Sequence, residues 1–147
     1  MEFEIREATI ADADEIYILN RDEMGYEFPV EQTKEKLIKL LSNSSDKIFV
    51  AVAENKVVGY VHANDYDVIY APHMKNIMGI AVSKDYKRNG IGVALLQFVE
   101  NWAKQTGASG VRLVSGESRT GAHEFYRHCG YVGGKKQINF KKIFKED

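Results

Sequence analysis

Residues 77–98 (IMGIAVSKDYKRNGIGVALLQF) place an apolar strand directly before an amphipathic helix and join the two through a basic turn. We expect the strand to end at Val82 and the helix to begin at Gly90. The helix is predicted because apolar residues recur at the i, i+3, i+4, i+7 and i+11 positions of one face. Those residues are Ile91, Ala94, Leu95, Phe98 and Trp102. This order of elements favours a fold in which helices cover a sheet.

The turn and the start of the helix are suited to binding an anion. Gly90 and Gly92 stand at the helix start, and Lys87 and Arg88 come just before them. The first N–H groups of a helix have no partner within it and carry partial positive charge, and glycine lets a ligand approach the backbone closely. The stretch therefore predicts a phosphate or pyrophosphate site.

The alternative interpretation is that these glycines serve the turn alone and that the basic pair is a solvated corner. Known phosphate motifs do not decide the matter. The Walker pattern is absent, and the dinucleotide pattern fails because Leu95 stands where its last glycine is needed.

The composition predicts one globular domain over residues 1–147. The chain is 44% hydrophobic with a formal net charge of −1, which fits a substantial core. No basic stripe suggests a nucleic-acid surface, no apolar run approaches the ~20 residues of a membrane helix, and the N-terminus has no signal pattern. Cys129 is the only cysteine, so no internal disulfide can form. We expect a cytoplasmic protein that binds neither nucleic acid nor membrane.

The rest of the chain alternates strand and helix patterns. The segments expected as strands are 3–8, 47–53, 57–63, 111–114, 131–132 and 137–144, and those expected as helices are 9–24, 30–41 and 119–129. Thr9 and Asp12 form a predicted capping box, and Glu54-Asn55-Lys56 predicts a hairpin turn. Residues 64–76 are expected as a recognition loop. The order predicts an α/β (α+β) chain, a mixed central sheet of about six to seven strands flanked by about four helices.

Two signatures in this order resemble the GNAT superfamily of N-acetyltransferases, which take acetyl from acetyl-CoA. The first, Q/R-x-x-G-x-G/A, is similar to residues 87–92. The second, A-x-x-F-Y-x-x-x-G-F/Y, is met by Ala122, Phe125, Tyr126, Gly130 and Tyr131. The resemblance extends to the opening IREATIADADEI and covers nearly the whole chain. It implies a GNAT fold and an enzyme that acetylates a primary amine by direct attack on acetyl-CoA, without a metal.

The resemblance also implies where the cosubstrate binds. The pyrophosphate would lie on the backbone N–H groups of residues 87–92, and the pantetheine arm would pair with the strand before them. In the family this strand splays from its neighbour, here 111–114, which leaves a slot for the thioester. The residues expected at the cosubstrate are Ile80, Ala81, Val82, Lys87, Arg88, Asn89, Gly90, Ile91, Gly92 and Arg119.

Two residues depart from the family pattern. Lys87 replaces the usual Arg or Gln and lacks a bidentate fork, so binding would depend more on Arg88 and the backbone. Arg119 stands where the family often has Asn. It would contact a CoA phosphate or an acidic group of the acceptor, or it is a solvated arginine at a helix start.

Tyr126 matches the tyrosine that family members commonly use to protonate the departing thiolate. A phenol with an ordinary pKa of about 10 is protonated at neutral pH; the alternative is a tyrosine at the edge of the core. The general base is less defined, because Met78 occupies the position of the carboxylate that many relatives use. Glu117, acting through water, ranks first, followed by His73 and Asp65, and an amine of lowered pKa would need no base.

The acceptor is implied only by segments that line its site in relatives. Glu23, Glu27, Asp65 and Asp67 lie there and suggest a cationic small-molecule or peptide amine, with Tyr66 and Tyr70 supplying cation–π surface. Solvated loop charge is the alternative. A non-catalytic acyl-CoA-binding sensor or partner module is the competing function, favoured by the missing base. Because family members often dimerise, a homodimer stays open.

Overall fold

The computed structural model describes residues 1–145. Met1–Leu113 form one compact unit and the residues from Val114 onwards a second, and each is described by itself. That the chain is a single domain stays a prediction.

The larger unit is built on a five-stranded mixed sheet of order β1-β2-β3-β4-β5. The strands are β1 (Glu4–Glu7), β2 (Asp46–Ala53), β3 (Lys56–Tyr66), β4 (Met74–Val82) and β5 (Val111–Leu113). The first four are antiparallel neighbours, and β5 runs parallel to β4. The predicted hairpin is confirmed, since Glu54 and Asn55 have positive φ angles of 53° and 65°, as a tight turn between twisted strands requires.

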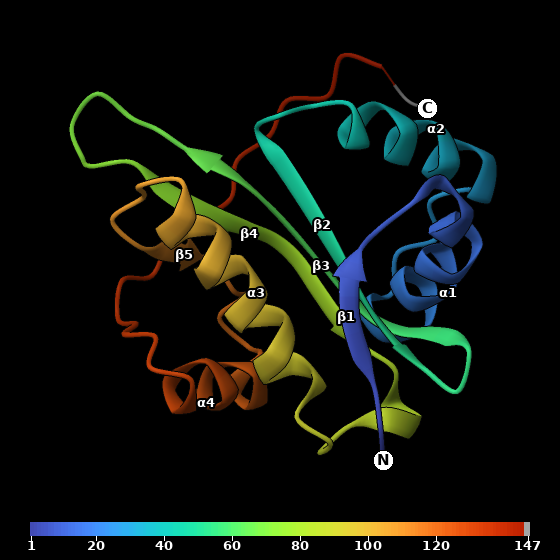
Figure 1. Cartoon of the computed structure of the whole chain (residues 1–147). Coiled ribbons are helices and arrows are strands. Elements are labelled where there is room, and N and C mark those ends of the chain that lie inside the picture. The colour runs from blue at the N-terminus through green and yellow to red at the C-terminus, as the bar shows by residue number, and fades with distance from the viewer. Residues whose placement is uncertain (146–147) are drawn as a thin grey trace. The chain divides into compact units, whose positions relative to one another are not determined.

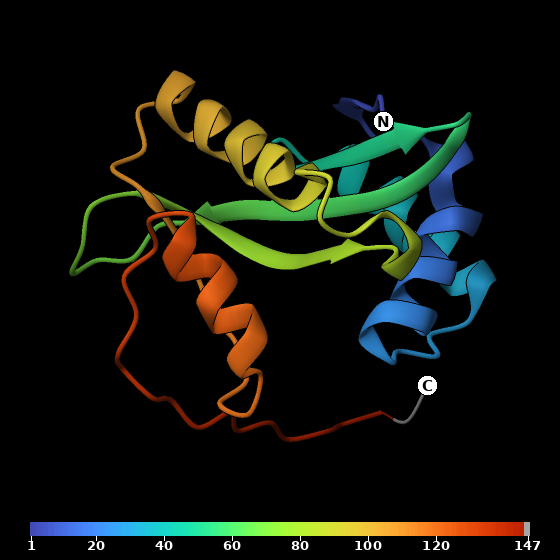
Figure 2. The same ribbon diagram turned by 90° about the horizontal axis from the view of Figure 1, so that it is seen from below.

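Helices cover both faces of this sheet (Figures 1 and 2). One face packs against α1 (Ala13–Met24) and α2 (Val30–Leu41), and the other against α3 (Ile91–Gln105). The core between the sheet and the first two helices includes Ile16, Leu19, Leu37, Ile48, Val50 and Tyr60. On the opposite face α3 crosses close to Gly59, where an added Cβ would lie 3.3 Å from Ile91 Cγ2 and 3.5 Å from Leu95 Cδ1. The mixed α/β architecture is confirmed, with five strands in place of the six to seven expected.

The segment expected as a loop at 64–76 is strand at both of its ends. β3 extends to Tyr66 and β4 begins at Met74, which leaves only 67–73 as the connection. The polar composition concealed the strands because the charged residues pair across them. The Lys75 ammonium pairs with Asp65 and lies 4.0 Å from the centre of the Trp102 ring.

The smaller unit contains one helix, α4 (Thr120–His128), within the predicted 119–129. The strand expected at 137–144 is wrong, as is the extended piece at 131–132. Between 114 and 145 no residue is in a strand, and Ile138 and Phe140 are 79% and 86% exposed. Alternating residues form a strand only where a neighbouring strand takes up their backbone hydrogen bonds.

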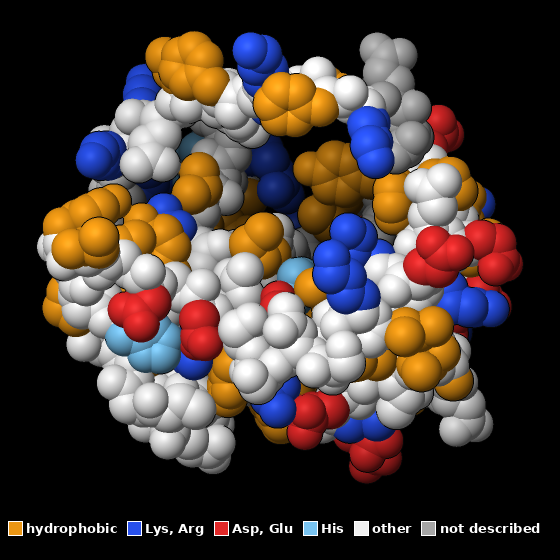
Figure 3. Space-filling model, turned by 90° about the horizontal axis from the view of Figure 1, so that it is seen from above, with side chains coloured by type: hydrophobic (Ala, Val, Ile, Leu, Met, Phe, Trp, Pro, Cys, Tyr) orange, Lys and Arg blue, Asp and Glu red, His pale blue; other side chains and the backbone are white. Residues whose placement is uncertain are grey.

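Across residues 1–145, no helix has both the length and the apolar character to cross a membrane. On the face of the molecule in Figure 3, Asp and Glu side chains lie interspersed with Lys and Arg side chains.

A buried carboxylate fixes the start of the first helical segment, as the predicted capping box requires. Asp12 ends the short 3₁₀ helix η1 (Ile10–Asp12) and is 4% exposed. It accepts hydrogen bonds from the Thr9 N–H at 2.8 Å and from both Arg6 Nη atoms at 2.8 and 2.9 Å. Burial alone would raise the pKa of Asp12, but these hydrogen bonds and the Arg6 charge outweigh it and lower that pKa.

We expect Asp12→Asn to reduce the free energy of unfolding by about 2 kcal/mol at neutral pH, because it weakens the cap and leaves Arg6 unpaired. The lowered pKa means that this contribution is present above the unfolded-state pKa of about 3.9 and is lost as the pH falls through the folded-state pKa. Urea unfolding at pH 7 and at acid pH measures this contribution to the free energy of unfolding. Asp22→Asn, which removes a fully exposed ion pair with Arg21, is the control and should leave the midpoint unchanged. An unchanged midpoint for Asp12→Asn at pH 7 would contradict the expectation.

Candidate functional site

The helix α3 begins at a left-handed glycine, as the sequence predicts. Gly90 is the N-cap residue, with φ 81° and ψ 8°, a conformation that glycine adopts without strain. Arg88, two residues earlier, also has a positive φ of 67°. The Ala94 N–H donates to the Gly90 carbonyl at 3.0 Å, so the N–H groups of residues 91–93 precede the hydrogen-bond ladder of the helix and are available to a ligand.

The turn before α3 is held by its own side chains. Its 3₁₀ segment η2 (Lys84–Tyr86) is anchored by the buried Tyr86, whose hydroxyl donates to Glu54 Oε1 at 2.7 Å. The Asn89 side-chain amide donates to the carbonyls of Tyr86 and Lys87 at 3.0 and 3.2 Å. These bonds occupy carbonyl groups of the turn. The Tyr86 N–H donates to the Ser83 carbonyl at 2.9 Å, so the N–H groups that could serve an anion are those that follow Tyr86.

Glu23, at the end of α1, contacts this turn through both of its carboxylate oxygens. One carboxylate oxygen accepts the Lys84 N–H at 3.0 Å, and the other lies 3.7 Å from Lys87 Nζ. The Lys87 side chain is 60% exposed, so it can turn to a bound phosphate, but that phosphate must compete with Glu23. That binding depends more on Arg88 and the backbone stays a prediction.

Beyond Ile77, β4 has an open edge. β5 pairs with it only at Lys75, Asn76 and Ile77, through Val111, Arg112 and Leu113. On its other side β4 stays paired with β3 as far as Val82. Among the described strands, none pairs with residues 78–82 on the β5 side. β5 ends at Leu113, so the backbone of 80–82 lies along the open edge; that the two strands splay apart stays a prediction.

Met78 occupies a β-bulge at the start of this open edge. The register with β3 passes from the pair His62–Gly79 to the pair Ala63–Ile77, so Met78 has no partner. A bulge bends the strand and re-aims the side chain of the extra residue, and Met78 is 56% exposed. The position from which relatives would deprotonate the acceptor thus carries a thioether, which does not take up a proton at neutral pH.

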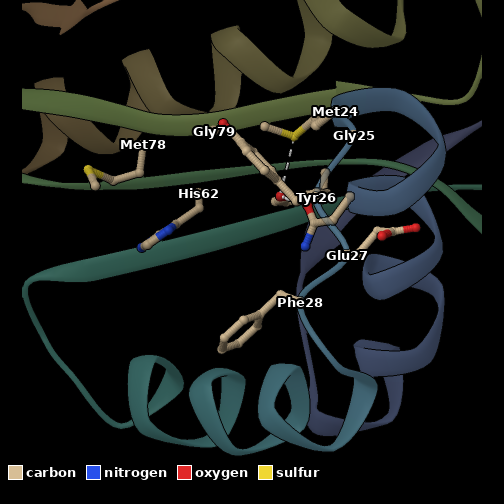
Figure 4. A pocket seen from close by; sticks show the side chains of 10 residues that line it. Met24, Gly25, Tyr26, Glu27, Phe28, His62, Met78 and Gly79 are labelled. Atoms are coloured by element: carbon tan, nitrogen blue, oxygen red, sulfur yellow. Dashed lines mark hydrogen bonds between the residues drawn. The ribbon is translucent and has the colours of Figure 1, made fainter. Parts of the chain in front are cut away.

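A pocket of about 510 Å³ lies beside the bulge, within the larger unit (Figure 4). The end of α1, the connection to α2, β3 and β4 contribute its lining, which consists of Asn20, Met24, Gly25, Tyr26, Glu27, Phe28, Tyr60, His62, Met78 and Gly79. Burial raises the pKa of Tyr60 to about 12, and its hydroxyl donates to the side-chain Oδ1 of Asn20. Aromatic walls with one carboxylate suit a small organic cation.

Of the four acidic residues expected on the acceptor side, only Glu27 lines this pocket. Asp65 is paired with Lys75, and its Oδ1 also lies 3.0 Å from His73 Nε2. Asp65 and His73, the two alternative bases, are therefore in contact with each other. Asp67 is exposed in the connection between β3 and β4. The ring of Tyr66 is already covered by the Arg112 guanidinium at 4.1 Å.

The remaining predicted residues lie in the smaller unit. Tyr126 is buried on α4, with its ring centre 5.4 Å from that of Phe125. Burial raises the pKa of Tyr126, against a smaller opposing effect of the Arg119 cation. Arg119 is the N-cap residue of α4. Glu117 is exposed, and its Oε1 lies 2.7 Å from Lys136 Nζ.

The sequence analysis missed the two polar residues that β3 contributes to the pocket. Tyr60 and His62 are two apart and therefore share a face of the strand. That period-two pattern within 57–63 was the available signal, but it does not say which face meets a pocket.

The family is decided by comparison with known proteins. The model of the Acetyltransferase (GNAT) family matches residues 13–131, most of the chain. The protein belongs to the GNAT family.

Individual GNAT proteins resemble it over different shares of their length. An aminoalkylphosphonate N-acetyltransferase from Salmonella typhimurium is 27% identical over 139 residues, covering 94% of this chain and 88% of its own. An uncharacterized N-acetyltransferase from Methanocaldococcus jannaschii is 33% identical over 94 residues, 63% of this chain, and the aligned part spans 42% of that protein. The structure of AAC(6')-Iy in complex with the bisubstrate analog CoA-S-monomethyl-acetylneamine matches with a TM-score of 0.86 over 97% of this chain and 99% of its own, at 16% identity. This likeness confirms the fold.

Proposed function

We propose that this GNAT protein is an N-acetyltransferase that moves the acetyl group of acetyl-CoA to a primary amine. The observation that carries the proposal is the continuity of the open β4 edge with the glycine-capped start of α3. One segment, 78–93, offers first a strand edge and then the N-terminus of a helix. A strand edge suits the amides of a pantetheine arm, and the helix start suits a diphosphate.

The donors of this segment fit the cosubstrate chemically. The main chain of Ile80, Ala81 and Val82 would pair with the pantetheine amides. The diphosphate would take the backbone N–H groups of residues 87–92, supported by the Lys87 and Arg88 side chains. Arg119 would contact a phosphate of CoA or an acidic group of the acceptor. When bound, acetyl-CoA supplies an activated thioester carbonyl.

Tyr126 is proposed as the general acid. The neutral acceptor amine attacks the thioester carbon, the carbon–sulfur bond breaks, and the departing sulfur takes the proton of the Tyr126 hydroxyl, which solvent then restores. The raised pKa of Tyr126 supports this role, because it keeps the phenol protonated through neutral and mildly alkaline pH. Glu117, proposed from the sequence as a base acting through water, is exposed and paired with Lys136, which weighs against it.

The acceptor is proposed to be a small cationic amine bound in the pocket beside Met78. Glu27 would attract its charge, and the rings of Tyr26 and Phe28 would contact its cationic or apolar parts. The names of the relatives agree in kind, since one acetylates an aminoalkylphosphonate and another is bound to an analog that joins CoA to acetylneamine.

A non-catalytic acyl-CoA-binding module is the second candidate, because Met78 removes the base that relatives use. Thiol release from acetyl-CoA across a panel of polyamines, aminoglycosides, aminoalkylphosphonates and lysine peptides, with mass spectrometry of the products, separates the two. An acetylated amine with stoichiometric free thiol is expected. CoA binding without thiol release from any amine would favour the module, and absence of CoA binding would overturn both.

A further inference from the structure

The proposed acceptor pocket contains a histidine that a buried carboxylate holds in place. His62 Nε2 lies 2.7 Å from Asp46 Oδ1, and the two side chains are 18% and 7% exposed. The other Asp46 oxygen accepts hydrogen bonds from Asn43 Nδ2 at 3.0 Å and from Ser45 Oγ at 3.3 Å. The Asp46 carboxylate is thus held by hydrogen bonds from its own turn as well as by its contact with the imidazole.

The strand register explains why the two residues meet. β2 begins at Asp46, and Ile48, two residues later, is paired with His62 on β3. Residues two apart share a face of a strand, so Asp46 and His62 lie on the same face as diagonal neighbours. This is the face that α1 and α2 cover and on which the pocket opens.

The carboxylate sets the tautomer of the imidazole. An ionised carboxylate only accepts hydrogen bonds, so the proton between the two groups is carried by His62 Nε2, and Nδ1 keeps its lone pair. The carboxylate of Asp46 also stabilises the positive charge that appears when Nδ1 takes a second proton. An aspartate that orients a histidine in this way is a recurrent arrangement for a general base.

The imidazole reaches the region where the usual base is missing. His62 is paired with Gly79, which has no side chain to cover it, and the bulged Met78 follows directly on β4. All three residues line the pocket. Figure 4 shows the side chains of His62 and Met78 reaching toward the same end of it.

We propose that His62 is the general base of the transfer and that Asp46 is its positioning residue. This inference rests on the proposed function. The acceptor ammonium gives one proton to His62 Nδ1, directly or through one water, and the resulting neutral amine attacks the thioester carbon. As the amide forms, its nitrogen loses a second proton to solvent, which offsets the proton that solvent restores to Tyr126. The imidazolium returns its own proton to solvent after the product leaves, so one proton is released per turnover.

Few charged groups face the imidazole within the described pocket. Asp46 on β2 contacts it, Glu27 and Tyr26 come from the connection between α1 and α2, and Tyr60 is two residues away on β3. The residues that α1 and β4 contribute do not titrate. Because a general base accepts a proton only when it is unprotonated, the test records kcat as a function of pH.

The test is His62→Gln in the full chain, with an amine that the panel identifies. Glutamine keeps a donor for Asp46 but takes up no proton. We expect kcat to fall about 100-fold at pH 7.5, with the Kd of CoA unchanged. The deficit should shrink as the pH approaches the pKa of the free amine, about 10 for an alkylamine, because solvent then deprotonates the acceptor. His128→Gln, an exposed histidine on the last turn of α4, should keep the parent kcat.

A second variant keeps the inference testable if His62→Gln does not fold. Asp46→Asn removes the carboxylate that orients the imidazole, so kcat should fall about tenfold while the KM of the amine stays unchanged. A parent-like kcat in His62→Gln, a deficit that persists unchanged at high pH, or a parent-like kcat in Asp46→Asn would overturn this inference and leave the proposed function standing. Failure of the unaltered protein to acetylate any amine would overturn both.

Discussion

Tyr126→Phe is expected to lower kcat for acetyl transfer about 1,000-fold while leaving the Kd of acetyl-CoA unchanged. The change removes only the hydroxyl, so the buried ring keeps its contacts with Phe125 and Tyr131. Without the phenolic proton, the sulfur must leave as a free thiolate, and the barrier rises. Steady-state kinetics, with CoA titrated separately by calorimetry, measures both quantities.

The pH dependence adds a second readout for the same residue. Burial raises the pKa of Tyr126, so the phenol is protonated and active up to a pH above its ordinary pKa of about 10. We expect kcat to hold through pH 9 and to fall only beyond that ordinary value. Tyr17→Phe, on α1, removes a hydroxyl elsewhere and should keep the parent kcat. Equal kcat values for Tyr126→Phe and the parent would remove Tyr126 from the mechanism.

Gly90→Val is expected to weaken CoA binding about 100-fold, because two charge-assisted hydrogen bonds at about 1.5 kcal/mol each are lost. Gly90 has a φ of 81°, which a β-branched residue does not adopt without strain. The start of α3 would therefore shift, and its N–H groups would no longer converge on the diphosphate. A side chain at residue 90 would also stand where the ligand must approach the backbone.

Gly107→Val is the matched control for this prediction. Gly107 follows the other end of α3 with a φ of 77°, and, as at Gly90, an added Cβ would meet nothing within 4 Å. The two variants should therefore lose similar stability through backbone strain, while only Gly90→Val loses CoA affinity. Calorimetric titration and thermal unfolding of both proteins separate the two effects. Undiminished affinity in Gly90→Val would contradict the site assignment.

Features that depend on local chemistry could be predicted from the sequence. Asp12 caps the first helical segment, Gly25 ends α1 in a left-handed conformation, and Gly90 begins α3. Each of these signals acts within a few residues of chain, so no knowledge of the fold is needed. The open edge of β4 was expected only through the family resemblance.

Features that depend on a distant partner could not be predicted. The C-terminal alternation at Ile138 and Phe140 suggested a strand, but a strand depends on a neighbour that the pattern does not name. The extension of β3 and β4 was concealed because Asp65 and Lys75 neutralise each other across the strands. His62 and Asp46 are 16 residues apart, and only the register of β2 and β3 brings them together. Phe98, on the predicted apolar face of the helix, is 38% exposed, although its ring centre lies 5.4 Å from that of Phe49 on β2.

The account depends most on the binding of the CoA diphosphate at the start of α3. A crystal structure of the protein with CoA tests this directly. We expect the diphosphate oxygens to accept hydrogen bonds from the N–H groups of residues 87–92, and the pantetheine amides to pair with the open edge of β4 at residues 80–82. A diphosphate bound away from the start of α3 would contradict the account.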